Sequence, residues 1–282
     1  MLWKGALHSL GRSLGRIGQP GDGPRIGVAL GGGFARGVAH IGVLRALQRF
    51  NIPIYAIAGV SAGSVVASAF ASGAPCDEIA EMAKAMKFRD VARWTIDWKG
   101  VLDSERMDGF LHRLLKVHTF ENMKLPLAVV ASDLGSGLPA VYRKFGDVIM
   151  PVRASCSYPG LFKPVEYQGR LLVDGMVAME VPAKPLLEMG ATHVLSVYLP
   201  GEDENVDPMN VLQIVNRCFQ ILSVRVESEW RRHSDLVIVP EVGECSWDSF
   251  DNVPRLIASG ERAVEKALPE ITSWLKLVGP KG

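Results

Sequence analysis

Ser61 lies in the segment Gly59-Val60-Ser61-Ala62-Gly63, between an apolar run and a stretch of helical character. A sharp strand-to-helix turn of this kind lifts a serine side chain above a sheet, and flanking glycines relieve the crowding at the turn. The backbone N–H of Ala62 would then join the donors that stabilise an oxyanion. The segment therefore predicts a nucleophilic serine.

A glycine-rich turn comes earlier in the chain. Gly31, Gly32 and Gly33 directly follow an apolar run, and Arg36 and Gly37 lie where a helix begins. Backbone N–H groups in such a turn point into open space, where the dipole of the following helix also favours negative charge. The turn predicts a site for an anion, either a phosphate or the oxyanion of acyl transfer.

Nucleotide binding is disfavoured by the spacing of these glycines. Three residues separate Gly33 from Gly37, whereas the dinucleotide fingerprint has two at that place and a carboxylate about twenty residues further on. The Gly-Lys-Ser/Thr of a Walker A loop is also missing from the sequence. We therefore favour the oxyanion over the phosphate.

A serine hydroxyl needs a base to become a good nucleophile. In the usual hydrolase order an acid and then a histidine follow the serine. The histidines of the chain are His8, His40, His112, His118, His193 and His233. None lies in the glycine- or proline-marked loop expected for a catalytic histidine, so we predict structural or solvated roles for all of them.

Asp174 is the other candidate base. It ends an apolar run and is followed by Gly175, which permits a tight turn. A carboxylate within hydrogen-bond reach of a serine can act as a general base directly, and burial would raise its pKa toward the working range. Taken alone, Asp174 would be interpreted as an acid that merely caps a turn rather than as a base.

The elements that must hold these residues alternate along the chain. Apolar runs cover residues 25–30, 53–60, 126–134, 192–199 and 235–242. Helical stretches lie at 38–50 and 61–73, and a long amphipathic helix is predicted over 209–233. Continuous apolar runs between helices indicate a mainly parallel sheet covered on both faces, that is, a three-layer α/β/α sandwich.

One stretch allows a different interpretation. Residues 52–76 carry no charged side chain and are numerous enough for a transmembrane helix. Pro53, Pro75 and the glycines between them instead favour a buried strand, a turn and a buried helix.

Composition excludes several classes of function. The chain has 282 residues, of which 48% are hydrophobic and 22% charged, so it supports a large core. Its net charge of +1 without a basic run argues against nucleic acid as a partner. Cys76, Cys156, Cys218 and Cys245 lie far apart and indicate reduced thiols of a cytoplasmic protein rather than a zinc site or disulfides.

Residues 1–23 are predicted to form an amphipathic arm and linker, and residues 24–282 the folded domain. Basic residues recur on one side of a helical wheel drawn over residues 1–18, with apolar residues on the other. Such an arm either contacts anionic headgroups at the inner face of the membrane or packs on the protein itself. Both alternatives remain open.

In order and spacing, the segments Gly31–Gly37, Gly59–Gly63 and Asp174-Gly175 resemble those of the patatin-like phospholipase family, specifically its small bacterial members. The stretch Ala154–Gly175 also resembles the family's approach to its aspartate. The resemblance runs from about Arg25 to the last helix.

The resemblance implies a Ser61/Asp174 dyad that hydrolyses acyl esters of lipids, without a cofactor or metal. It implies an oxyanion hole built from Gly31, Gly32 and Gly33, with Ala62 as a further donor. Arg36 is expected to orient the glycine-rich loop or to meet a phosphate. The remaining motif glycines, expected to support these turns, are Gly37, Gly59, Gly63 and Gly175.

Two positions depart from the family pattern. Met176 stands where glycine or alanine is usual, and Glu180 stands where asparagine often occurs. Met176 adds bulk beside the expected base, which leaves open a non-catalytic lipid-binding or regulatory protein on the same fold. For Glu180 we favour a neutral change on a solvated turn over a second carboxylate that raises the pKa of Asp174.

Overall fold

The computed structural model describes residues 23–87, 90–91, 93–94, 102–200, 211–243 and 252–276. The predicted arm and linker lie outside these residues except for Gly23, so the structure does not test them. No helix in the described ranges has both the length and the apolarity to cross a bilayer. The uncharged stretch 52–76 folds as predicted, into strand β2 (Ala56–Val60) and helix α3 (Ala62–Ser72).

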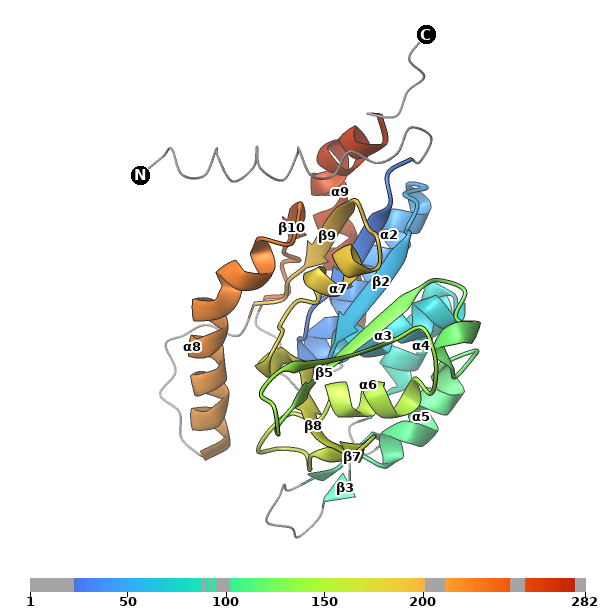
Figure 1. Cartoon of the computed structure of the whole chain (residues 1–282). Helices are drawn as coiled ribbons and strands as arrows, with labels where there is room; N and C mark the ends of the chain where they lie inside the picture. The colour runs from blue at the N-terminus through green and yellow to red at the C-terminus, as the bar shows by residue number, and fades with distance from the viewer. Residues whose placement is uncertain are drawn as a thin grey trace.

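A parallel sheet forms the centre of the molecule (Figure 1). Its strands run in the order β10-β9-β1-β2-β5, and all their mutual pairings are parallel. Besides β2 they are β1 (Ile26–Leu30), β5 (Leu127–Asp133), β9 (His193–Val197) and β10 (Leu236–Ile238). Each of the five predicted apolar runs thus contains one strand.

An antiparallel extension completes the sheet. Strands β6 (Pro139–Arg143) and β8 (Arg170–Asp174) both pair with β5, and β7 (Val165–Tyr167) pairs with β8. A separate two-stranded sheet joins β3 (Arg93–Trp94) to β4 (Leu102–Asp103). The extension matters for function because β8 ends at Asp174.

Helices cover both faces of the sheet and give the predicted three-layer sandwich (Figure 1). One layer holds α2 (Ala39–Arg49), α3, α4 (Cys76–Ala85), α5 (Arg106–Leu114), α6 (Ile149–Ser155) and α9 (Val253–Lys276). The other holds α7 (Ala183–Glu188) and α8 (Val211–Arg231). Short 3₁₀ helices cover Phe34–Val38 (η1), Phe120–Asn122 (η3) and Gly175–Val177 (η4).

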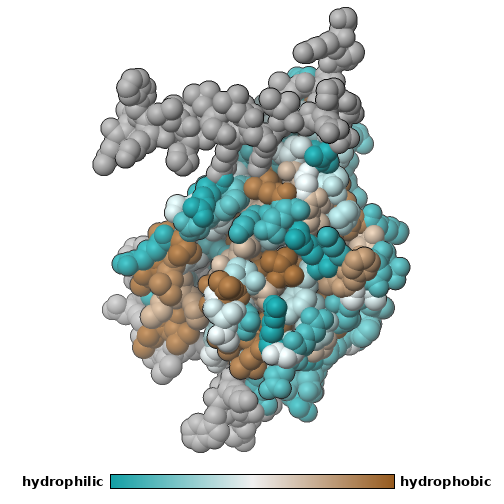
Figure 2. Space-filling view, viewed as in Figure 1, coloured by the Kyte–Doolittle hydropathy of each residue, from teal (hydrophilic) through white to brown (hydrophobic). Residues whose placement is uncertain are grey.

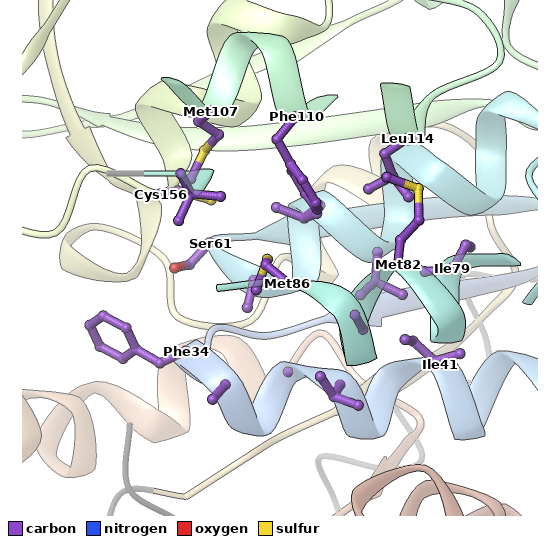
Figure 3. Close-up of a pocket in the computed structure, with 18 of the residues that line it drawn as sticks. Phe34, Ile41, Ser61, Ile79, Met82, Met86, Met107, Phe110, Leu114 and Cys156 are labelled. Carbon is purple, nitrogen blue, oxygen red and sulfur yellow. The ribbon is translucent and has the colours of Figure 1, made fainter. Parts of the chain in front are cut away.

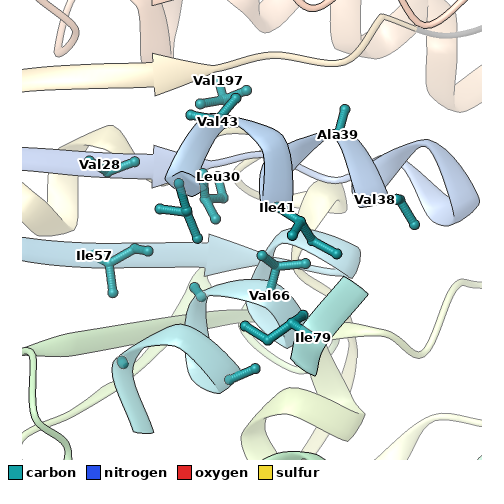
Figure 4. Close-up of a cluster of buried hydrophobic side chains, with 14 of the residues drawn as sticks. Val28, Leu30, Val38, Ala39, Ile41, Val43, Ile57, Val66, Ile79 and Val197 are labelled. Atoms are coloured by element: carbon teal, nitrogen blue, oxygen red, sulfur yellow. The ribbon is translucent and has the colours of Figure 1, made fainter. Parts of the chain in front are cut away.

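The main core lies between the sheet and the thicker helical layer. Val28, Leu30 and Ile57 of the strands meet Ile41 of α2 and Val66 of α3 there (Figure 4). Because successive strand residues point to opposite faces, the alternate residues of the same strands face α7. Those are small, among them Ala29, Ala56, Ala58 and Ala128. The small side chains let α7 pack close to the sheet.

Helix α2 is fixed by an unusually close contact with α9. A Cβ atom added to Gly42 would lie 1.9 Å from the carbonyl oxygen of Ile257, and one added to Gly260 would lie 2.0 Å from that of Ala39. Such distances require glycine at both positions, because the obstructing atoms belong to the backbone. The start of α2, which carries His40, is thereby held in place.

Candidate active site

Ser61 forms the turn between β2 and α3 in a strained conformation, with φ 51° and ψ −128°. The neighbouring glycines are required by packing. A Cβ atom on Gly59 would lie 2.5 Å from the carbonyl oxygen of Gly63, and one on Gly63 would lie 2.4 Å from that of Leu30. The geometry is that of the predicted elbow, which presents a serine at the carboxyl end of a parallel strand.

Ser155 stabilises the turn at Ser61 through hydrogen bonds, a role that the sequence motifs did not predict. Its hydroxyl accepts a hydrogen bond from the backbone N–H of Ser61 at 2.8 Å and donates to the carbonyl of Val130 at 2.6 Å. The side chain is completely buried. Ser155 therefore ties the serine turn to β5. In the sequence, its position within the stretch Ala154–Gly175 was the single feature that could have drawn attention to it.

Strand register brings Asp174 to Ser61. Val60 pairs with Val130 of β5, and Asp174 pairs with the next β5 residue, Ala131. Strand β6 pairs along one edge of β5, so β2 and β8 share the other edge. On that shared edge β2 pairs with the first part of β5 and β8 with its last part. The last residue of β8 and the first residue after β2 consequently lie side by side.

The carboxyl group of Asp174 is completely buried. Its Oδ1 accepts a hydrogen bond from the N–H of Met176 at 3.0 Å, and Oδ2 has no hydrogen-bond partner in the described structure. Burial raises the pKa of Asp174 to about 7, against smaller lowering effects of the Met176 N–H and the nearby Ser61 hydroxyl. The side chains of Ser61 and Asp174 do not make a hydrogen bond of ordinary geometry here. Catalytic contacts of this kind often become shorter when substrate binds.

The turn after Asp174 is pinned by backbone contacts. The N–H of Asp174 donates to the backbone carbonyl of Ser157 at 2.9 Å, and the hydroxyl of Ser132 donates to the carbonyl of Gly175 at 3.2 Å. A Cβ atom on Gly175 would lie 2.1 Å from the carbonyl oxygen of Val130, so glycine is required there. These contacts leave the carboxyl group little freedom.

The glycine-rich turn differs from the prediction at Gly31. The N–H of Gly31 donates to the carbonyl of Val197 at 3.1 Å and extends the pairing of β1 with β9, so it is not free to meet an oxyanion. In the described structure, the N–H groups of Gly32, Gly33 and Ala62 have no acceptor. A Cβ atom on Gly32 would lie 3.6 Å from Cβ of Ser61, which places this glycine against the serine.

His40 orients the peptide group between Gly31 and Gly32. Its Nε2 lies 2.9 Å from the carbonyl oxygen of Gly31. Burial lowers the pKa of His40 to about 4, so the ring is neutral at pH 7 and Nε2 carries the hydrogen donated to the carbonyl. In a planar trans peptide the C=O and the N–H point in opposite directions. The Gly32 N–H is therefore turned away from α2 and left available beside Ser61.

Arg36 acts on the same loop. Its Nη1 donates to the carbonyl of Pro200 at 2.7 Å, and its Nε donates to that of Gly33 at 3.4 Å. The residue is only 8% exposed. Of the two predicted roles, these contacts favour orienting the loop over meeting a phosphate. Gly37 lets η1 approach α3, since a Cβ atom there would lie 2.4 Å from that of Ala62.

Met176 and Glu180, the two departures from the family pattern, lie in different surroundings. The Met176 N–H holds the Asp174 carboxylate, and Cβ of Met176 faces Gly32, 3.9 Å from an added Cβ atom. Glu180 is not on a solvated turn. Its Oε2 is buried without a hydrogen-bond partner in the described structure, and burial raises its pKa. Glu180 is not among the groups that shift the pKa of Asp174.

A cavity of about 150 Å³ opens beside Ser61. Figure 3 shows Ser61 at one end, and Ile79 and Leu114 at the other. Apart from Ser61 the lining is apolar, with several methionines, and Cys156 lies near the serine. Burial raises the pKa of the Cys156 thiol, so it stays protonated and is not a second nucleophile.

His193 and His233 lie elsewhere, and His8 is outside the described residues. His193 begins β9 at the amino end of the parallel strands, where it stacks on Trp274 with ring centroids 5.0 Å apart. His233 follows α8 and contacts the carbonyl of Glu229 through Nδ1. Within the described residues, no group of three His, Cys, Asp or Glu side chains is arranged to hold a metal ion.

Comparisons with known proteins agree with this geometry. Residues 28–187 match the family model described as patatin-like phospholipase. An uncharacterized NTE family protein of Mycobacterium tuberculosis is 36% identical over 183 residues, which are 64% of this chain and 50% of that protein. The chain thus spans about half the length of this relative.

Two further similarities support the fold. Lysophospholipase NTE1 of Cryptococcus neoformans is 31% identical over 195 residues, 67% of this chain and 12% of that protein. The crystal structure of VipD from Legionella pneumophila superposes with a TM-score of 0.57 at 12% identity, covering 88% of this chain and 67% of that one. At that identity the similarity to VipD concerns the fold alone.

The His40 contact leads to a prediction about turnover of an acyl ester. The His40→Ala variant loses the donor that orients the Gly31–Gly32 peptide, and we expect kcat to fall roughly tenfold to a hundredfold with little change in KM, because the N–H acts on the transition state. The His40→Gln variant offers a side-chain N–H near the same place and should recover part of the loss. Steady-state kinetics at temperatures where circular dichroism shows all three proteins folded would measure both. Equal kcat values in wild type and His40→Ala would contradict the assignment.

Proposed function

The chain belongs to the patatin-like phospholipase family, and we propose that it is a serine hydrolase of lipid acyl esters with Ser61 as nucleophile and Asp174 as general base. The observation that carries this proposal is the apolar cavity that ends at a serine beside a buried carboxyl group. Such a cavity suits an acyl chain, and the serine at its mouth is where the ester carbonyl would lie.

The first half of the reaction is acyl transfer to the enzyme. The Asp174 carboxylate takes the hydroxyl proton of Ser61 while the serine oxygen attacks the ester carbonyl. Negative charge develops on the carbonyl oxygen, and the N–H groups of Gly32, Gly33 and Ala62, which have no acceptor in the described structure, would stabilise it. The tetrahedral intermediate then expels the alcohol, which receives the proton from Asp174, and the acyl group stays on Ser61.

The second half repeats these roles with water. Asp174 takes a proton from a water molecule, which attacks the acyl carbonyl, and the released Ser61 oxygen recovers the proton. A carboxyl group with a pKa of about 7 suits both directions of transfer near neutral pH, since a base works best when its pKa is close to the working pH. Burial, the largest cause of the raised pKa, is therefore part of the proposed mechanism.

We propose a lipid with one acyl chain in the cavity and its polar group outside. The cavity has an apolar lining up to Ser61, and flexible methionines such as Met82, Met86 and Met107 adapt to chains of different shape. The name of the Cryptococcus neoformans relative, lysophospholipase, supports a single-chain substrate class for this chain as well.

The dyad is tested with a fluorophosphonate probe and p-nitrophenyl esters. The probe should label wild type but not Ser61→Ala, because it needs an activated serine. Ester hydrolysis should fall by roughly 10²- to 10⁴-fold in Asp174→Asn, the usual contribution of a general base. His193→Ala and His233→Ala serve as controls and should keep their activity. Absence of labelling in folded wild type would favour the non-catalytic lipid-binding alternative, and loss of turnover in a histidine control would favour a triad.

The proposed place of the acyl chain gives a second test. Met82 lines the far end of the cavity beside Ile79 (Figure 3), so Met82→Trp should shorten the space available. Exclusion of about two methylenes, at about 0.8 kcal/mol each, lowers kcat/KM for a long-chain ester about tenfold relative to the butyrate ester. Ala85→Trp, exposed on the same helix, is the matched control. An unchanged chain-length preference in Met82→Trp would place the acyl chain elsewhere.

A further inference from the structure

Helix α8 exposes apolar side chains along its outer face. Figure 2 shows this face as a hydrophobic patch at the left of the molecule, where Figure 1 places α8. The exposed side chains are Ile214 (48%), Ile221 (44%), Leu222 (55%), Val224 (56%) and Val226 (47%). An amphipathic helix on the surface of a globular protein normally turns its apolar side inward. Helix α8 turns Phe219 and Trp230 inward, but it leaves these five apolar side chains exposed.

The inner face of α8 adds polar contacts to the packing of Phe219 and Trp230. The hydroxyl of Tyr158 donates to Oδ1 of Asn216 at 2.9 Å. Ser223 and Trp230 lie close enough to Glu180 to lower the pKa of its carboxyl group, against the larger effect of burial. Phe219, Trp230 and these polar groups together set the orientation of the helix, and the apolar side chains on its outer face are left for another contact.

The charges on the outer face indicate what that contact is. Arg225 follows Ile221 by one helical turn, so it lies within the apolar face, and it is exposed. In the described part of the structure no acidic group pairs with it. The core of a protein interface would bury this guanidinium, which is costly unless the partner supplies a well-placed carboxylate. At the boundary of a bilayer the same side chain reaches the phosphate layer while its apolar neighbours enter the acyl region.

The position of α8 connects this face to the cavity. The ring of Tyr158 packs on Phe219 of α8, with centroids 5.6 Å apart, and on Phe34, with centroids 5.0 Å apart. Phe34 lines the cavity beside Ser61. Three aromatic rings in contact therefore lead from the helix to the Ser61 end of the cavity, so α8 lies near the place where the ester group of a substrate would be held.

We propose that the outer face of α8, formed by Ile214, Ile221, Leu222, Val224, Val226 and Arg225, is a docking surface for phospholipid bilayers. The choice of a lipid partner rests on the proposed function, because a hydrolase of lipid esters has to draw its substrate from such a surface. The helix lies along the bilayer with its apolar side chains among the acyl chains and Arg225 at the headgroup phosphates.

The test measures co-sedimentation of the full chain with vesicles of phosphatidylcholine and phosphatidylglycerol. All proteins carry Ser61→Ala, so that lipid hydrolysis does not alter the vesicles. Adding Leu222→Asp should lower the partition coefficient about tenfold or more, because a leucine that would enter the acyl region of the bilayer is replaced by a charge. Phe145→Asp is the matched control, since Phe145 is 78% exposed at the end of β6 farthest from the site. It should bind like the parent.

Equal binding of Leu222→Asp and the parent would overturn the proposal, as would no binding by the parent. Sedimentation velocity adds a second criterion, because a parent dimer that Leu222→Asp converts to a monomer would identify the face as a contact between copies of the chain. In proteins that keep the native Ser61, Leu222→Asp should leave the hydrolysis of soluble p-nitrophenyl butyrate unchanged. Absence of that hydrolysis in wild type, together with intact vesicle binding, would reject the proposed function and leave the docking surface standing.

Discussion

The buried carboxyl group of Asp174 is the constraint around which the rest of the site is arranged. Its pKa is raised from 3.8 to about 7, and burial is the main cause. Since each pKa unit corresponds to about 1.4 kcal/mol, the ionised carboxylate costs the folded state roughly 4 kcal/mol relative to an exposed one. This cost falls progressively as the pH drops from 7 to about 4, because the folded state holds the proton over this range while the unfolded state binds it only near pH 4. A structure retains such a group where chemistry needs it.

Backbone contacts rather than side chains give the site its shape. Glycines at positions 59, 63 and 175 allow main-chain atoms to approach within distances that any Cβ atom would prevent. Buried hydroxyls then satisfy the polar groups that this crowding leaves, with Ser155 bridging the serine turn and β5. His40 does the same for the glycine-rich turn. Each contact restricts a peptide group, so the proposed oxyanion donors are fixed before any substrate arrives.

Part of this arrangement could be predicted from sequence. The turn at Ser61 and the strands on either side follow from local signals, because glycine spacing and apolar runs report on the backbone nearby. The pairing of β8 along the β5 edge vacated by β2 could not be predicted, since register depends on contacts between distant segments. For the same reason the sequence did not show that Gly31 donates to Val197, nor that Ser155 lies beneath Ser61. The amphipathic character of α8 was visible, but the face that it turns inward depends on packing against Tyr158 and other residues that are distant in sequence.

The most direct measurement of the central claim is the pH dependence of the rate at which a fluorophosphonate modifies Ser61. If Asp174 is the base, the rate rises with pH along a single titration with a midpoint of about 7, because only the carboxylate can take the serine proton. The Asp174→Asn protein should lose this titration and react slowly at every pH. A midpoint near 4, or a profile that Asp174→Asn leaves unchanged, would contradict the account.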